Sequence, residues 1–315
     1  MAGQVTIRRP QNMRRAPTTL FDLVTTLGLT SGVANIIMQL SLPPVGYGVN
    51  ESRVASGSPR RYPIKRARTT GQYLVVAVIG TDADRDLMRA EIAEAHKAVV
   101  SEPDSPVRYS GNSPELQKWV AACLFRFYLD QYTLLYGELT EPELDVLTRA
   151  AEPLATGVNV RARAWPTSWA EFARYWESRL GDLAIDPPVR HDFETLSDLE
   201  FIVEAWGPLG KPFPMLLGPS YRYLTRANLP AEFRDLMGWE WSERDARRFE
   251  RVKSVLRVAD RFGGRAYVRA VYRIQLADFR IRVRLGMPVL GPLRVSDVPI
   301  KDGGAQRWIT RHLTG

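Results

Sequence analysis

Residues 113–137 read SPELQKWVAACLFRFYLDQYTLLYG, and this stretch decides the fold class. Ser113 followed by Pro114 is a helix-start signal, because serine caps free backbone N–H groups and proline fits the first helical turn. Gly137 is a typical stop signal. The long, largely apolar run between them predicts a helix buried in the core.

Similar helix-start and helix-stop signals recur along the rest of the chain. A Ser or Thr followed three residues later by Asp or Glu marks a helix start, and this spacing is found at Thr81/Asp84, Thr140/Glu143, Ser168/Glu171 and Ser242/Asp245. Together with Gly80 as a stop, these signals predict helices over 65–79, 81–99, 114–136, 242–262 and 266–285. The β-branched run at 74–79 leaves a strand open, although its flanks favour helix. The sequence therefore predicts an all-α protein with a single large helical domain.

The domain limits follow from composition. We expect a flexible basic N-terminus over residues 1–19, the helical domain over 20–286 and a C-terminal tail over 287–315. No charge occurs from residue 23 to residue 50, but the glycines and prolines there indicate a buried helix followed by a turn rather than a membrane span. The absence of a signal-peptide pattern and the single cysteine predict a cytoplasmic protein, with peripheral membrane contact left open.

The counts of histidine and cysteine limit the chemistry. The chain has three histidines and one cysteine, Cys123. One sulfur can build neither a disulfide framework nor a cysteine-rich zinc site. A site that needs a single histidine, such as one axial ligand of a haem, stays open.

His96 is the histidine with the most informative surroundings. It follows Met88 and Ile92 on one face of the expected 81–99 helix. Such a residue is most often a core histidine with a satisfied hydrogen bond, and the alternative is an axial haem ligand.

Three polar residues on the preceding helix raise a similar choice. Arg66 and Thr70 are four residues apart and share one helix face, with Thr69 beside them. They are either surface residues or the polar groups of a buried pocket. Glu51 is the first carboxylate for 28 residues and is either a solvated helix cap or an acid/base in a pocket.

The net charge of +8 is local. Residues 244–294 contain fourteen Arg/Lys and four Asp/Glu, a net of +10. Arginines recur every four residues from 257 to 273, but this spacing drifts around a helix. Nucleic-acid or anionic-membrane binding stays open, although no recognition motif accompanies the charge and no nucleic acid is expected as a partner.

Several motifs, taken in order, resemble a known family. They are Met38-Gln39-Leu40 with Pro43-Pro44, Gly48-Val49 with Glu51-Ser52, Arg66 with Thr70 and Tyr73, Gly80-Thr81, His96, Ser113-Pro114-Glu115-Leu116 with Trp119-Val120, and Pro166 with Ser168-Trp169 and Phe172. Their order over roughly residues 25–285 resembles the MpaB-type oxygenases, which include the latex clearing protein (rubber oxygenase).

The resemblance implies a globin-like core that holds haem b. His96 would be the proximal iron ligand, Arg66 and Thr70 distal groups near dioxygen, and Glu51 a distal acid/base if one gap is allowed. Thr69 would contact the cofactor, but it replaces a lysine that can ligate iron in the latex clearing protein, so the resting state need not match.

The sequence thus favours a haem-dependent oxidoreductase that uses dioxygen on an apolar, lipid- or terpenoid-like substrate. The alternatives are a non-catalytic helical carrier of haem or lipid and a nucleic-acid-binding protein with a basic face. The sequence names neither the substrate nor the oligomeric state.

Overall fold

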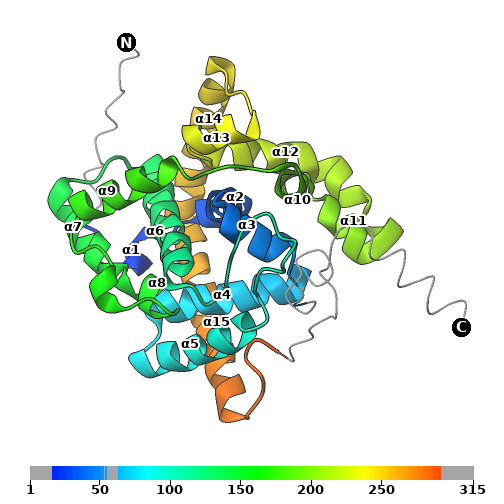
Figure 1. The fold of residues 1–315 in the computed structure, drawn as a ribbon. Helices are drawn as coiled ribbons and strands as arrows, with labels where there is room; N and C mark the ends of the chain where they lie inside the picture. Colours follow the sequence, from blue (N-terminus) through cyan, green and yellow to red (C-terminus); the bar gives the residue numbers. More distant parts are fainter. Residues whose placement is uncertain (1–15, 53, 55–62, 292–315) are drawn as a thin grey trace, which may run out of the picture.

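A computed structural model describes residues 16–52, 54 and 63–291 (Figure 1). Within these residues every named element is a helix, and Val100 and Ser110 form an isolated antiparallel bridge. The all-α prediction is confirmed. The predictions for the two termini fall largely on residues 1–15 and 292–315, which lie outside the described residues.

The α-helices share no regular repeat of length. They are α1 (Leu20–Leu23), α2 (Gly32–Leu40), α3 (Pro43–Asn50), α4 (Pro63–Ile79), α5 (Asp82–His96), α6 (Pro114–Tyr136), α7 (Glu141–Ala150), α8 (Glu152–Thr156), α9 (Trp169–Leu180), α10 (Pro187–Ser197), α11 (Glu200–Trp206), α12 (Pro212–Asn228), α13 (Ala231–Met237), α14 (Glu243–Ala259) and α15 (Arg265–Arg284). Short 3-10 or π turns lie at η1 (Thr26–Leu29), η3 (Ala162–Ala164), η4 (Gly207–Gly210) and η5 (Asp260–Gly264).

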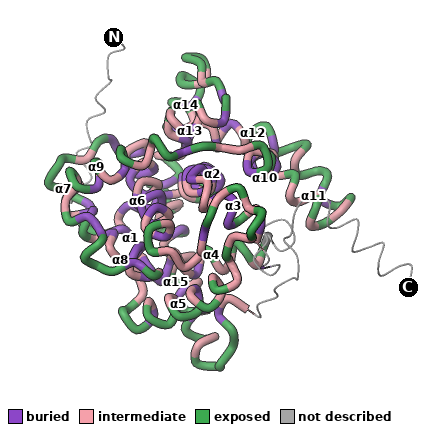
Figure 2. Tube along the Cα trace, in the orientation of Figure 1, coloured by how far each residue is buried: buried purple, intermediate pink, exposed green. Residues whose placement is uncertain are grey.

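The predicted helix α6 forms the centre of the core, where buried residues concentrate in Figure 2. Trp119, Phe125 and Tyr132 on this helix are fully buried. The Trp119 ring stacks on Trp176 of α9 with 5.1 Å between centroids, and Phe125 packs edge-on against Phe172. The aromatic side chains Phe172 and Trp176 of α9 are therefore part of the core.

Helices α2 and α3 correct one prediction. Residues 43–50 form a helix rather than the expected Pro/Gly turn. Pro43 occupies the first helical position, where its missing N–H costs nothing. A side chain at Gly46 would lie 2.5 Å from the Leu40 carbonyl oxygen, so the glycine permits the close approach of α3 to α2.

Helices α4, α5 and α15 share a second, smaller core. Val75 and Val76 of α4 pack with Met88 of α5 and with Leu276 and Phe279 of α15. The run at 74–79 is thus helical, because its β-branched side chains fill the space between two other helices.

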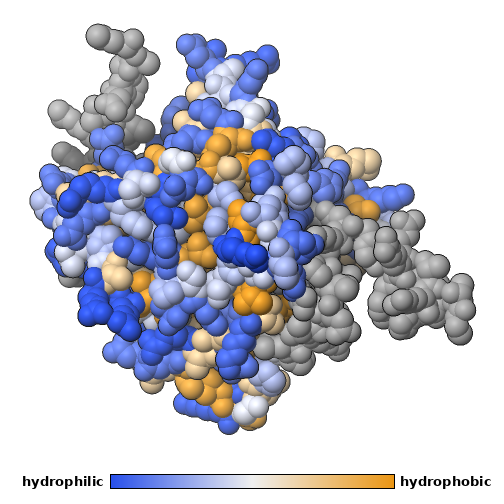
Figure 3. Space-filling view, viewed as in Figure 1, coloured by the Kyte–Doolittle hydropathy of each residue, from blue (hydrophilic) through white to orange (hydrophobic). Residues whose placement is uncertain are grey.

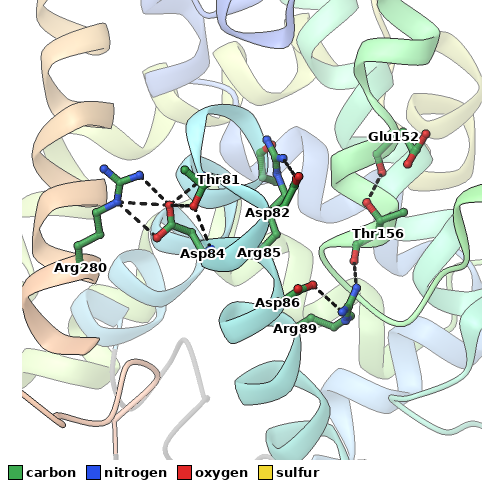
Figure 4. Close-up of polar contacts among 10 residues, drawn as sticks. Thr81, Asp82, Asp84, Arg85, Asp86, Arg89, Glu152, Thr156 and Arg280 are labelled. Atoms are coloured by element: carbon green, nitrogen blue, oxygen red, sulfur yellow. Dashed lines mark hydrogen bonds and ion pairs between the residues drawn. The ribbon is translucent and has the colours of Figure 1, made fainter. Parts of the chain in front are cut away.

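The start of α5 is held by a buried carboxylate (Figure 4). Asp84 accepts hydrogen bonds from the Thr81 N–H at 2.9 Å and from Arg280 Nη2 at 2.7 Å. Burial raises the pKa of Asp84, but the bonds from Arg280 and Thr81 outweigh it and leave the pKa lowered. Further along the helix, Arg89 donates to the Thr156 carbonyl. Helix α5 is therefore tied to both α15 and α8.

Helix α5 ends at His96, three residues before the expected end. The Val99 N–H bonds to the His96 carbonyl in a turn, and the chain then pairs Val100 with Ser110. Gly111 returns the loop to Val99 through a 2.7 Å backbone bond. The turn thus places His96 at the end of a rigid helix.

The basic C-terminal helices run one after the other along the height of the molecule (Figure 1). Gly263, with a φ of 109°, breaks the helix between α14 and α15, as the two consecutive glycines predict. Many of the arginines form hydrogen bonds or ion pairs within the fold. Arg257 donates to the Leu135 carbonyl, and Arg269 donates to the Phe21 carbonyl and pairs with Asp22.

The molecular face in Figure 3 is mostly hydrophilic, with hydrophobic side chains showing through over its middle. Within the described chain, no helix has the length and hydropathy needed to cross a bilayer.

Substituting the carboxylate that caps α5 tests this account. Asp84→Ala removes a helix cap and an ion pair together, so it should lower the free energy of unfolding by about 2 kcal/mol. Urea denaturation measures this change. Asp82→Ala is the matched control, since Asp82 lies in the same helical turn but is exposed. Equal losses in the two variants would contradict the anchoring role of Asp84.

Candidate functional site

His96 is half-buried and keeps one ring edge against protein. Its Nδ1 atom lies 3.2 Å from Nε2 of Gln117 on α6, and the Gly111 backbone also hydrogen-bonds the ring. A side chain at Gly111 would come 3.1 Å from the His96 Cβ atom, so glycine lets the loop fold onto the histidine. No partner among the described residues bonds the Nε2 atom of His96.

The amide of Gln117 fixes this arrangement. Its oxygen accepts a 2.5 Å bond from the Asn159 N–H, and its nitrogen donates to the Gly111 carbonyl at 2.7 Å. A backbone N–H can only donate, so the bond from Asn159 sets which end of the amide faces His96. Gln117 is itself buried.

The electrostatics keep His96 neutral. Burial lowers its pKa, the positive charge of Arg66 lowers it further, and the Gly111 backbone opposes both. In a neutral imidazole, Nε2 is available as a ligand when the proton is on Nδ1, and it carries the proton itself when Nδ1 accepts a bond from the Gln117 amide.

Arg66 combines two properties that rarely occur together. Its side chain is exposed, yet burial lowers the pKa of its guanidinium. Among the described residues it has no carboxylate partner. Its positive charge is one cause of the lowered pKa of His96, so Arg66 of α4 and His96 of α5 interact electrostatically.

The two threonines of α4 differ in their hydrogen bonding and exposure. The Thr69 hydroxyl donates to the Arg66 carbonyl at 3.2 Å, inside its own helix. Thr70 is exposed and stands one turn after Arg66. Further along this face, the Tyr73 hydroxyl donates to the Leu154 carbonyl, and Ala77 is buried.

Glu51 caps the end of α3 and is 8% exposed. Its Oε2 atom accepts a 3.0 Å hydrogen bond from the Tyr109 hydroxyl. The close approach of the Tyr109 ring to Gly48, 3.4 Å from an added Cβ, aligns this pair. Within the described part of the chain, no hydrogen bond or ion pair joins Glu51 to Arg66 or His96.

The structure therefore groups His96 with Arg66 and attaches Glu51 to a separate partner. Sequence reasoning missed Gln117, Gly111 and Tyr109, whose contacts depend on the fold of the loop after α5. The neighbouring motif at Ser113 was the nearest signal for Gln117. A surface hollow of about 410 Å³ opens beside Tyr109, but none of the five predicted site residues lines it.

The fold and these residues define a class: an all-helical protein in which a neutral histidine at a helix end senses the charge of an arginine that has no carboxylate partner among the described residues. The chain belongs to the family described as ER-bound oxygenase mpaB/B'/rubber oxygenase, catalytic domain, which matches residues 23–258. It is thus a member of a family of oxygenase catalytic domains.

Two relatives support this membership. An uncharacterised protein of Mycobacterium bovis and one of Mycobacterium tuberculosis are each 43% identical to the chain over 258 residues. Each comparison covers 82% of this chain and 98% of the relative. No solved structure matches the chain significantly.

The buried histidine predicts a pH dependence of stability in the cofactor-free protein. Because the folded-state pKa of His96 lies below the ordinary 6.5, protonation favours the unfolded state. The stability that neutral His96 contributes is complete above about pH 6.5 and is lost as the pH falls toward the lowered pKa. We expect His96→Gln to remove roughly 1 kcal/mol of the wild-type loss between pH 7.5 and 5.5.

Denaturant titrations at the two pH values measure this difference, with His191→Gln as the control histidine variant. An unchanged pH dependence in His96→Gln would refute the buried, neutral state of His96.

Proposed function

We propose that this protein is a haem-b-dependent oxygenase that acts on an apolar, lipid- or terpenoid-like substrate. The observation that carries the proposal is a half-buried His96 whose Nε2 atom has no partner among the described residues, inside an oxygenase-family domain. A globin-like arrangement of helices around the cofactor is part of the proposal.

The donor set of His96 fits an axial ligand. Haem iron needs one neutral imidazole nitrogen, and the other nitrogen is then held by a carbonyl, carboxylate or water. In the tautomer with its proton on Nδ1, His96 would donate to the Gly111 backbone and leave Nε2 free to bind iron. The Gln117 amide nitrogen, which donates to the Gly111 carbonyl, would then be a neighbour of Nδ1 and not its hydrogen-bond donor. Gln117 holds that carbonyl in place.

Arg66 fits the surroundings of the cofactor. Its side chain is exposed, and a guanidinium without a carboxylate partner among the described residues can bind an anion. Bound haem b supplies the redox chemistry that activates dioxygen. Arg66 would provide a positive charge and Thr70 a hydroxyl donor, while Thr69 would contact the cofactor.

Glu51 has the carboxylate that an acid/base needs, but within the described residues it has no hydrogen bond or ion pair with Arg66 or His96. Its carboxylate is buried and oriented by the Tyr109 hydroxyl, so a proton could be exchanged at Oε2. We propose this role only for the loaded protein. The apolar class of substrate rests on the family resemblance, since Tyr73 and Ala77 on α4 and Met88 and Ile92 on α5 pack in the core.

Haem titration tests the proposal directly. Purified protein mixed with haemin should develop a Soret band that is lost in His96→Ala and kept in His191→Ala. Oxygen uptake with unsaturated lipids and terpenoids then tests turnover. Haem binding without any oxygen-dependent turnover would contradict the enzyme and favour a carrier, and a protein that takes up no haem would contradict both.

Arg66 has a separate test in the haem-loaded protein. Arg66→Met should weaken azide binding to the ferric protein by about 10-fold or more, because a hydrogen bond to a charged group contributes roughly 1.5–3 kcal/mol. Arg161→Met, which removes an exposed arginine elsewhere, is the control. Spectral titration gives both affinities, and equal values would remove Arg66 from the site.

A further inference from the structure

The outward side of α14, η5 and α15 carries seven large apolar side chains that no described element covers. Each is between 53% and 82% exposed. This outer stripe consists of Val255, Val258, Phe262, Tyr267, Ile274, Ile281 and Leu285.

The stripe on α15 lies opposite the face that packs into the protein. At about 100° per residue, Tyr267, Ile274, Ile281 and Leu285 fall within roughly 40° of one another around the helix. Leu276 and Phe279, which are buried in the second core, point the other way. Helix α15 therefore has two apolar faces, of which the fold uses one.

Unpaired cations accompany the stripe. Arg244, Arg251, Arg261 and Arg284 are exposed and have no hydrogen bond or ion pair among the described residues. The exposed acids of α14 are neutralised locally, since Glu243 pairs with Arg247 and Glu250 with Lys253.

The acidic residue of α15, Asp278, is also paired within the fold. Asp278 bonds both Arg282 and Gln72. The unpaired charge beside the stripe is thus positive, with three of the four arginines on α14 and η5 and the fourth at the end of α15.

We propose that the outer stripe docks on an anionic lipid surface. Exposed apolar side chains flanked by arginine are the combination that binds a bilayer interface, where the apolar groups enter the acyl boundary and the cations meet phosphate. A second copy of the chain fits less well, because its own arginines would face these. A nucleic acid would use the arginines but leave the valines, isoleucines and Phe262 exposed to water.

Vesicle binding tests the proposal on the full chain. The protein should co-sediment with vesicles of equal parts phosphatidylcholine and phosphatidylglycerol, and bind pure phosphatidylcholine at least 10-fold more weakly. The double variant Ile274→Asp, Ile281→Asp should lose at least 10-fold in affinity for the anionic vesicles. Leu87→Asp is the matched control, since Leu87 is an exposed leucine on α5, outside the stripe.

A charge variant separates the two contributions. Arg251→Glu with Arg284→Glu should also weaken vesicle binding, and added salt should reduce the wild-type affinity. Circular dichroism and urea unfolding confirm that each variant is folded. The haem content has no bearing on these results, so they stand or fall separately from the proposed function.

Three results would overturn the proposal. The first is a wild-type protein that does not co-sediment with anionic vesicles. The second is a dimer that Ile274→Asp converts to monomer in sedimentation velocity, which would assign the stripe to self-association. The third is DNA binding that the arginine variant abolishes and the isoleucine variant leaves intact, with no vesicle binding.

Discussion

The side-chain amide of Gln117 is the constraint on which the site depends. It joins three separate segments, because it receives the Asn159 N–H, donates to the Gly111 carbonyl and meets the His96 ring. A buried amide with these partners cannot rotate without leaving polar groups unsatisfied. The central helix α6 thereby holds both the loop after α5 and the imidazole at the end of α5.

The second feature of the site is the positive charge of Arg66, which no carboxylate among the described residues compensates. Arg66 is desolvated and has no acidic partner within the described chain, and its charge acts on His96. The Arg66 side chain is exposed, so an anion or a polar ligand can reach it. Helix α4 packs on α15, and α5 packs on α8, so both residues are carried by helices that are fixed in the fold.

The helices were predictable wherever their signals are local. The Thr81 and Ser113 caps and the Gly263 break act within a few residues, and each was found in the structure. Residues 43–50 were predicted wrongly, because Pro and Gly also serve a helix that packs closely on its neighbour.

The site was predictable only in part. The sequence singles out His96 as the one histidine on an apolar helix face, but its partners Gln117 and Gly111 depend on how a later loop returns. The outer stripe could not be predicted from the sequence for a similar reason. Only the packing of α15 shows which of its two apolar faces is left uncovered.

The central claim is that Nε2 of His96 holds the iron of a bound haem. Resonance Raman spectroscopy of the ferrous, haem-loaded protein tests it most directly. The account predicts an iron–nitrogen stretching band that shifts when the histidines carry nitrogen-15, disappears in His96→Gly and returns when imidazole is added. A band that persists unchanged in His96→Gly would contradict it.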